Sequence, residues 1–125
     1  FILMENIYEE FVSKFTAAVK NLKSGNPLEE GIQVGPLARK DLADQLQEQV
    51  KKSIAMGAEL LLGGQQNGAY HEPTVLGNVK PGMPAFSEET FGPLAAMIKV
   101  KTIEEAFELS EQSRYGLGNS LHHQY

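Results

Sequence analysis

The chain has 125 residues, of which 42% are hydrophobic and 22% are charged, a composition typical of one globular domain. Its 11 basic and 16 acidic residues give a formal net charge of −5, which excludes the basic surface of a general nucleic-acid-binding protein. The sequence has no cysteine, so these residues offer no disulfide, no zinc–thiolate site and no thiol nucleophile.

The chain carries no sign of a membrane segment, because no apolar run approaches the ~20 residues that a bilayer requires. The apolar opening Phe1–Met4 is too short for a signal peptide and is followed by Glu5. We therefore expect a cytoplasmic protein without a membrane or nucleic-acid partner. Because the sequence opens on Phe1, in residues typical of the middle of a strand, we also expect it to be a fragment.

The first helix is predicted over about residues 7–23. Asn6 and Glu9 can form a capping box at its start, and Gly25 and Pro27 end it. Its apolar residues recur at spacings of three and four, which places them on one inward face. These residues are Tyr8, Phe11, Val12, Phe15, Val19 and Leu22.

A second helix is predicted over about residues 38–56, after a turn-rich stretch over residues 24–36. Gly57 is well placed to end this helix. Its remaining positions are polar and charged, so we expect only a narrow face to be buried. The apolar stripe, with a strict four-residue spacing, consists of Leu42, Leu46, Val50 and Ile54.

Short apolar runs predict the strands. Residues 58–62 read as a buried strand, and 94–100 as a third strand. Between them, 70–76 read as a strand in which Pro73 indicates an edge strand, the start of a strand or an irregular strand. Residues 1–4 can form one more. Strands alternating with helices predict one α/β domain with a mostly parallel sheet flanked by helices.

A last helix is predicted to begin at Thr102, where Glu105 completes a capping box. Tyr115-Gly116-Leu117-Gly118 ends it. The residues expected to face inward are Ile103, Ala106, Phe107 and Ser110.

Candidate binding residues precede the strand at 94–100. Adjacent carboxylates at Glu88 and Glu89 can accept hydrogen bonds from a ribose diol, although composition alone favours a solvated acidic turn. Composition alone favours Phe91 as an apolar side chain that fills the core. The alternative is a ring that packs on a ligand.

The remaining polar motifs carry little chemistry. His71 is expected at the surface, and His122 and His123 as incidental residues of a polar tail without a metal set around them. Gly116-x-Gly118 lacks the third glycine and the preceding strand of a dinucleotide fingerprint. The residues therefore predict no metal site and no catalytic residue.

Three stretches are specific in their order. They are Gly35-Pro36-Leu37, the run GAELLLGG at 57–64, and the long run from Pro73-Thr74-Val75-Leu76 to Glu88-Glu89-Thr90-Phe91-Gly92-Pro93. In this order they resemble the aldehyde dehydrogenase superfamily, and most nearly the succinate-semialdehyde dehydrogenases. The resemblance covers residues 1–121, which we interpret as a truncated catalytic domain, whereas residues 122–125 do not fit and form a non-family tail.

The resemblance implies a fold and a chemistry. The fold would be part of a three-layer catalytic domain. In that family a cysteine thiolate attacks a small aldehyde, hydride passes to NAD or NADP, and water releases the acid. Glu89 resembles the glutamate that binds the nicotinamide ribose hydroxyls, and Phe91 the phenylalanine that packs near the nicotinamide.

The family cysteine would lie a few residues before Phe1. It is absent here, as are the glutamate base, the aldehyde-polarising asparagine and the dinucleotide-binding domain. We therefore expect the chain alone to be inactive and to bind no cofactor with useful affinity. Small aldehydes would be substrates only of the intact enzyme.

The alternative hypothesis is a non-catalytic interaction or assembly module derived from the same domain. A parallel sheet is normally covered on both faces, so we expect a piece of one to leave a strand edge open and to associate as a homo-oligomer, most simply a two-fold dimer. The segments expected near that surface are residues 94–100 and 58–62.

Overall fold

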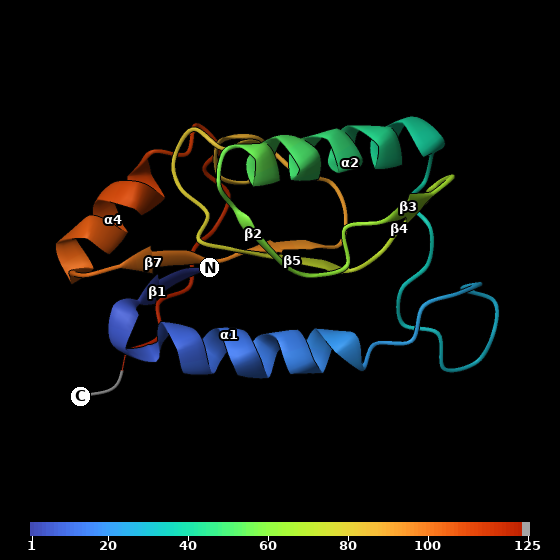
Figure 1. The fold of residues 1–125 in the computed structure, drawn as a ribbon, viewed down its shortest axis with the longest axis horizontal. Coiled ribbons are helices and arrows are strands. Elements are labelled where there is room, and N and C mark those ends of the chain that lie inside the picture. The colour runs from blue at the N-terminus through green and yellow to red at the C-terminus, as the bar shows by residue number, and fades with distance from the viewer. Residues whose placement is uncertain (124–125) are drawn as a thin grey trace.

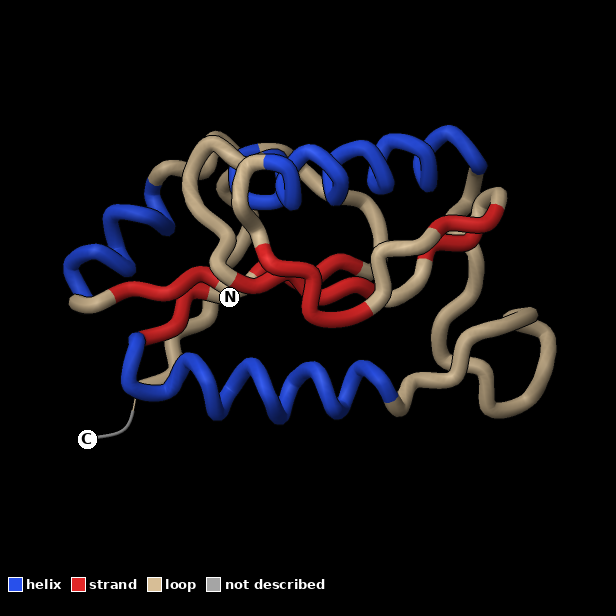
Figure 2. Tube along the Cα trace, in the orientation of Figure 1, coloured by secondary structure: helices blue, strands red, loops and turns tan. Residues whose placement is uncertain are grey.

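The computed structural model describes residues 1–123, so residues 124 and 125 of the predicted tail lie outside the described part. The strands form a middle layer, with α1 (Glu5–Lys20) on one face and α2 (Lys40–Ala55) and α4 (Ile103–Glu111) on the other (Figure 1). Figure 2 shows the same layers by type of structure. The layers confirm the predicted α/β class. The other elements are β1 (Ile2–Met4), β2 (Glu59–Leu62), β3 (Gln66–Asn67), β4 (Tyr70–His71), β5 (Thr74–Gly77), α3 (Pro84–Ser87), β6 (Leu94–Ala96) and β7 (Ile98–Val100).

Within residues 1–123 the strands form three small sheets. The largest has the order β2-β5-β6, in which β5 pairs antiparallel with β2 and parallel with β6. β1 and β7 form a parallel pair, and β3 and β4 a short antiparallel hairpin. Because only Met97 separates β6 from β7, one run of chain joins the two parallel pairings. No helix in this described part is long and apolar enough to cross a bilayer.

The core lies on both faces of β5, because successive side chains of a strand point to opposite sides. Val75 packs in a cluster with Tyr8 and Val12 of α1, and Leu76 packs in a second cluster with Val50 of α2. Both β5 side chains are fully buried. The strand is therefore apolar on both faces and joins the two helical layers.

The predicted first helix is confirmed, but the predicted capping box is wrong. The helix begins at Glu5, and Met4 is the N-cap residue without a side-chain hydrogen bond. The chain passes from β1 directly into α1. Asn6 therefore lies inside the first turn, where it cannot act as the cap.

The second helix is confirmed, but its buried face is wider than we expected. Leu46 and Val50 are buried as predicted, yet Ala43, Gln49 and Ser53 are buried as well. Positions three and four apart share one face of a helix, so the two polar residues lie beside the apolar stripe. This polar part of the buried face contacts the candidate site described below.

Two of the predicted strands are each divided in the structure. Pro73 lies between β4 and β5, immediately before the first residue of β5, which agrees with the alternative that it marks the start of a strand. The edge alternative is wrong, because β5 is the central strand of its sheet. The run at 94–100 changes partner at Met97. Met97 donates its backbone N–H to Leu76 at 2.9 Å, and Ile98 donates to Phe1 at 2.8 Å.

The cap of α4 is confirmed, because the Glu105 N–H donates to Thr102 Oγ1 at 3.1 Å. The expected inward face is only partly correct. Ile103 and Phe107 are 41% and 52% exposed, whereas the side chain of Leu109 packs against the core. The helix contacts β1 and β7 along a strip that leaves these two large apolar side chains outside.

Gly63 marks the closest approach between β2 and the start of β5. Its φ is +75°, and a Cβ there would lie 2.2 Å from the carbonyl oxygen of Pro73. We predict that Gly63→Ala lowers the free energy of unfolding by about 3 kcal/mol, because strained φ and overpacking add. Urea denaturation measures this change.

Gly68→Ala is the matched control, because Gly68 has a φ of +60° but nothing within 4 Å of its added Cβ. It should cost only about 1–2 kcal/mol. Equal losses for the two variants would show that the backbone angle, and not the close approach to Pro73, determines the requirement for glycine.

Candidate functional site

Both sequence-predicted site residues lie in the segment between α3 and β6. Glu89 is exposed, as we expected for an acidic turn. The side chain of Phe91 is 64% exposed, so the interpretation of this ring as a plug of the core is wrong. The structure thus brings a carboxylate and an aromatic ring together on one exposed stretch of chain, two residues apart.

The side-chain amide of Gln49 holds the first part of this segment against α2. Its Nε2 donates to the Glu88 carboxylate at 3.3 Å and to the Glu89 backbone carbonyl at 3.1 Å. Only 5% of Gln49 is exposed. Hydrogen bonds of this kind that are shielded from water and end on a charged group are stronger than exposed ones.

Two further contacts with α2 lie on either side of residues 88 and 89. In α3, the Ala85 N–H donates to the Ser53 hydroxyl at 3.0 Å, and this hydroxyl donates to the Gln49 carbonyl at 2.8 Å. Gly92 lies so close to α2 that a Cβ there would be 2.5 Å from Leu46 Cδ2. One face of α2 therefore contacts the chain before, within and at the end of the 88–92 segment.

Sequence reasoning missed Gln49 and Ser53 as residues of this site. Both were counted with the polar positions of a helix expected to bury only a narrow stripe. A signal was present, since positions 46, 49, 50 and 53 share one helical face and 46 and 50 are apolar. What the sequence does not reveal is the partner segment, which lies about 40 residues further along the chain.

His71 is buried in the structure, so its expected place at the surface is wrong. Its Nδ1 lies 2.8 Å from the Glu72 carbonyl oxygen and its Nε2 lies 2.7 Å from Gln47 Oε1. The Gln47 amide also donates to the Gly64 carbonyl at 3.0 Å. Gln47 therefore connects α2 to His71 of β4 and to the turn after β2, and the buried histidine is not available to a ligand.

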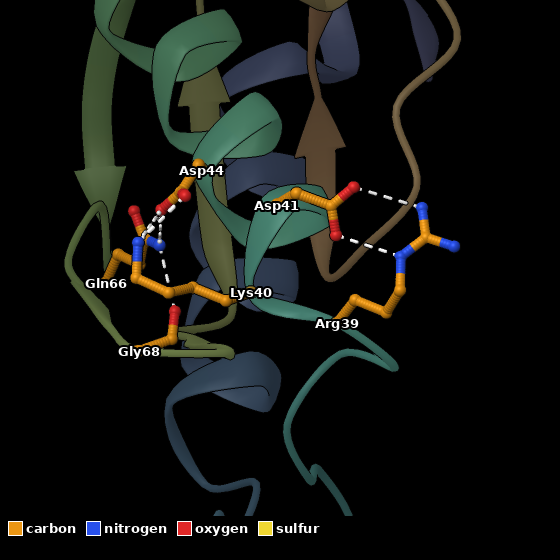
Figure 3. A network of polar contacts seen from close by, with 6 residues as sticks. All are labelled: Arg39, Lys40, Asp41, Asp44, Gln66 and Gly68. Carbon is orange, nitrogen blue, oxygen red and sulfur yellow. Dashed lines mark hydrogen bonds and ion pairs between the residues drawn. The ribbon is translucent and has the colours of Figure 1, made fainter.

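An exposed polar network attaches the β3–β4 hairpin to the start of α2 (Figure 3). Lys40 and Gln66 donate to the Asp44 carboxylate at 2.8 and 2.6 Å. The hydrogen bond from Lys40 lowers the pKa of Asp44, and the one from Arg39 lowers the pKa of Asp41. Exposed pairs of this kind contribute little to stability, so we interpret the network as a local contact and not as a binding site.

The described histidines and carboxylates do not gather into a metal site. In residues 1–123, no group of three or more His, Cys, Asp or Glu residues lies together in a way that could hold a metal ion. His122 is exposed and lies beside the Ser120 hydroxyl, 3.0 Å from its Nε2. The candidate site therefore consists of the 88–92 segment and the face of α2 that holds it.

Comparison with known proteins gives this site a family context. A model of the aldehyde dehydrogenase family matches residues 1–124. The NAD(P)+ succinate semialdehyde dehydrogenase Sad of Escherichia coli (strain K12) is 48% identical over 124 residues, which are 97% of this chain and 27% of that protein. The NADP+ succinate-semialdehyde dehydrogenase of Mycobacterium avium (strain 104) is 37% identical, over 96% of this chain and 26% of that protein.

Solved structures agree with the sequence relatives. The structure of aldehyde dehydrogenase 21 from Physcomitrella patens in complex with the reaction product succinate matches with a TM-score of 0.88 and 39% identity, over 93% of this chain and 24% of that one. The chain thus spans about a quarter of the length of the curated relatives it matches. The domain boundary that we expect after residue 121 stays a prediction.

We predict that His71→Leu lowers the free energy of unfolding by about 2–4 kcal/mol, because the Gln47 oxygen would lose its partner in a buried region and the Glu72 carbonyl would keep only the Thr74 hydroxyl. Urea denaturation measures the loss. The exposed His122→Leu variant is the control and should stay within about 0.5 kcal/mol of the parent. A loss below about 1 kcal/mol for His71→Leu would contradict a structural role for these contacts.

Proposed function

Because this chain belongs to the aldehyde dehydrogenase family, we propose that it forms part of an NAD(P)-dependent enzyme that oxidises an aldehyde to the carboxylic acid. We propose succinate semialdehyde as the substrate. Two relatives named as succinate-semialdehyde dehydrogenases and a similar structure that contains succinate support this substrate.

We assign to Glu89 and Phe91 the contact with the nicotinamide half of the cofactor. The observation that carries this assignment is the joint exposure of the two side chains on a segment held by α2. An ionised carboxylate only accepts hydrogen bonds, and a ribose diol offers two donors. An exposed aromatic ring can pack on the flat nicotinamide. When bound, NAD(P)+ supplies the hydride acceptor of the reaction.

The 125 residues do not include every group that the reaction needs. They contain no cysteine, and the resemblance to the family implies a thiolate nucleophile. Glu89 and Phe91 offer about 2–4 kcal/mol of gross contact energy, whereas association costs at least about 4 kcal/mol. We therefore propose that the chain alone turns over no aldehyde and binds NAD(P) very weakly.

A chimera tests the proposed function. The matching segment of Sad from Escherichia coli would be replaced by this chain, to which it is 48% identical. We predict that the chimera oxidises succinate semialdehyde, and that Glu89→Gln raises the cofactor KM by about tenfold or more, because hydrogen bonds to a charged acceptor contribute about 1.5–3 kcal/mol. Steady-state kinetics with NAD+ and NADP+ measure the change.

Glu108→Gln is the control for this experiment, since Glu108 is an exposed carboxylate on α4 with no assigned role. It should leave the cofactor KM unchanged. If Glu89→Gln has no larger effect than this control, the assignment of Glu89 is wrong. If the isolated chain turns over aldehyde in a preparation free of contaminating enzyme, the proposed dependence on the rest of a family enzyme is wrong.

A second candidate function is assembly by self-association. β2 and β6 are the outer strands of the three-stranded sheet, in the two segments that we expected at an interface. Leu60 of β2 is 42% exposed, and outer strands with exposed apolar residues tend to pair with other chains. We predict a dimer in light scattering at about 100 μM. A monomer at that concentration would contradict this candidate.

A further inference from the structure

We propose that Gln49 is the positioning residue for Glu89, and that its buried amide fixes the backbone that carries the Glu89 side chain before any cofactor binds. The proposal rests on the proposed function of Glu89 as a ribose-binding residue. It adds a residue from a different part of the chain, 40 positions earlier, to the site. Gln49 itself has no contact with a ligand in this proposal and acts only through its neighbours.

The chemistry of the contact determines how the amide is oriented. Both neighbours of Gln49 Nε2 are acceptors, namely the Glu88 carboxylate at 3.3 Å and the Glu89 backbone carbonyl at 3.1 Å. A side-chain amide has two N–H donors on its nitrogen. One donor is thus available for each acceptor, and the opposite orientation would place an oxygen against two acceptors. The contact therefore has one favourable arrangement.

The contact with Glu88 also determines on which side of the chain the Glu89 side chain lies. Glu88 has an extended backbone, with φ −109° and ψ 156°, and successive side chains of extended chain point to opposite sides. The Glu88 carboxylate turns toward α2, where Gln49 binds it. By this alternation the Glu89 side chain lies on the side of the chain away from α2, and Glu88 and Glu89 are both exposed.

Gln49 is itself held in place, as a positioning residue must be. It lies in the middle of α2 and is 5% exposed. Ser53, one turn later, donates to the Gln49 carbonyl and accepts from Ala85, so the same face of the helix also fixes α3. The segment that carries Glu89 thus begins from a fixed point and is fixed again at residues 88 and 89.

The first experiment measures the position of the segment without any cofactor. Gln49→Met keeps the length of the side chain and removes both donors. We expect the NMR order parameters of the backbone amides at 88–91 to fall from about 0.85 to below about 0.6. Gln45→Met is the matched control, with the same substitution at an exposed position of α2, and should change nothing. Unchanged order in Gln49→Met would overturn the proposal.

The second experiment connects the position of the segment to cofactor binding. In the Sad chimera, Gln49→Met should raise the dissociation constant for NADPH about tenfold by fluorescence titration. In a chimera that already carries Glu89→Gln, the same substitution should add less than about twofold, because residues that act through one group are not additive. Equal effects in the two backgrounds would indicate general destabilisation and would overturn the proposal.

The two proposals can fail separately. If Glu89→Gln alone leaves NADPH binding unchanged, the function assigned to Glu89 fails, and the order parameters still decide whether Gln49 positions the segment. If Gln49→Met does not fold, the unmodified chain provides the test. The side-chain amide protons of Gln49 should then exchange with solvent much more slowly than those of Gln45, and similar exchange rates would overturn the proposal.

Discussion

The buried side-chain amide of Gln49 has two N–H donors on its nitrogen. It faces two acceptors outside the strands, the Glu88 carboxylate and the Glu89 backbone carbonyl. Removing water from such a group is costly unless every donor finds a partner. Residues 88 and 89 provide those partners, and they can do so only if the chain after α3 runs across α2. The position of the backbone at Glu89 is thus a consequence of satisfying a buried group in α2.

The same helix organises most of what surrounds the site. Leu46 packs against Gly92, which allows the chain to turn toward β6 with no side chain in the way. Gln47, on the neighbouring side of α2, binds His71 and the turn after β2. α2 therefore acts as a common support for the β4 hairpin strand and for the 88–92 segment, while the sheet and α1 supply most of the remaining apolar core.

Local patterns in the sequence predicted the helices and the cap at Thr102, because these depend on neighbours a few residues apart. They failed where a contact joins distant parts of the chain. His71 is buried where Gln47 lies opposite it, and β5 is central because Leu76 pairs with Leu60 on one side and with Ala96 on the other. Gln49 was interpreted as solvated for the same reason, since its partners lie in another element.

A crystal structure of the Sad chimera with bound NADPH tests the role of Gln49 and Glu89 directly. If Gln49 positions Glu89 for the ribose, the Glu89 carboxylate lies within hydrogen-bond distance of the nicotinamide ribose hydroxyls, and Gln49 Nε2 stays within about 3.5 Å of the Glu89 carbonyl oxygen. A structure in which other groups bind the ribose, or in which Glu89 binds it after the Gln49 contact has broken, would show that this role is wrong.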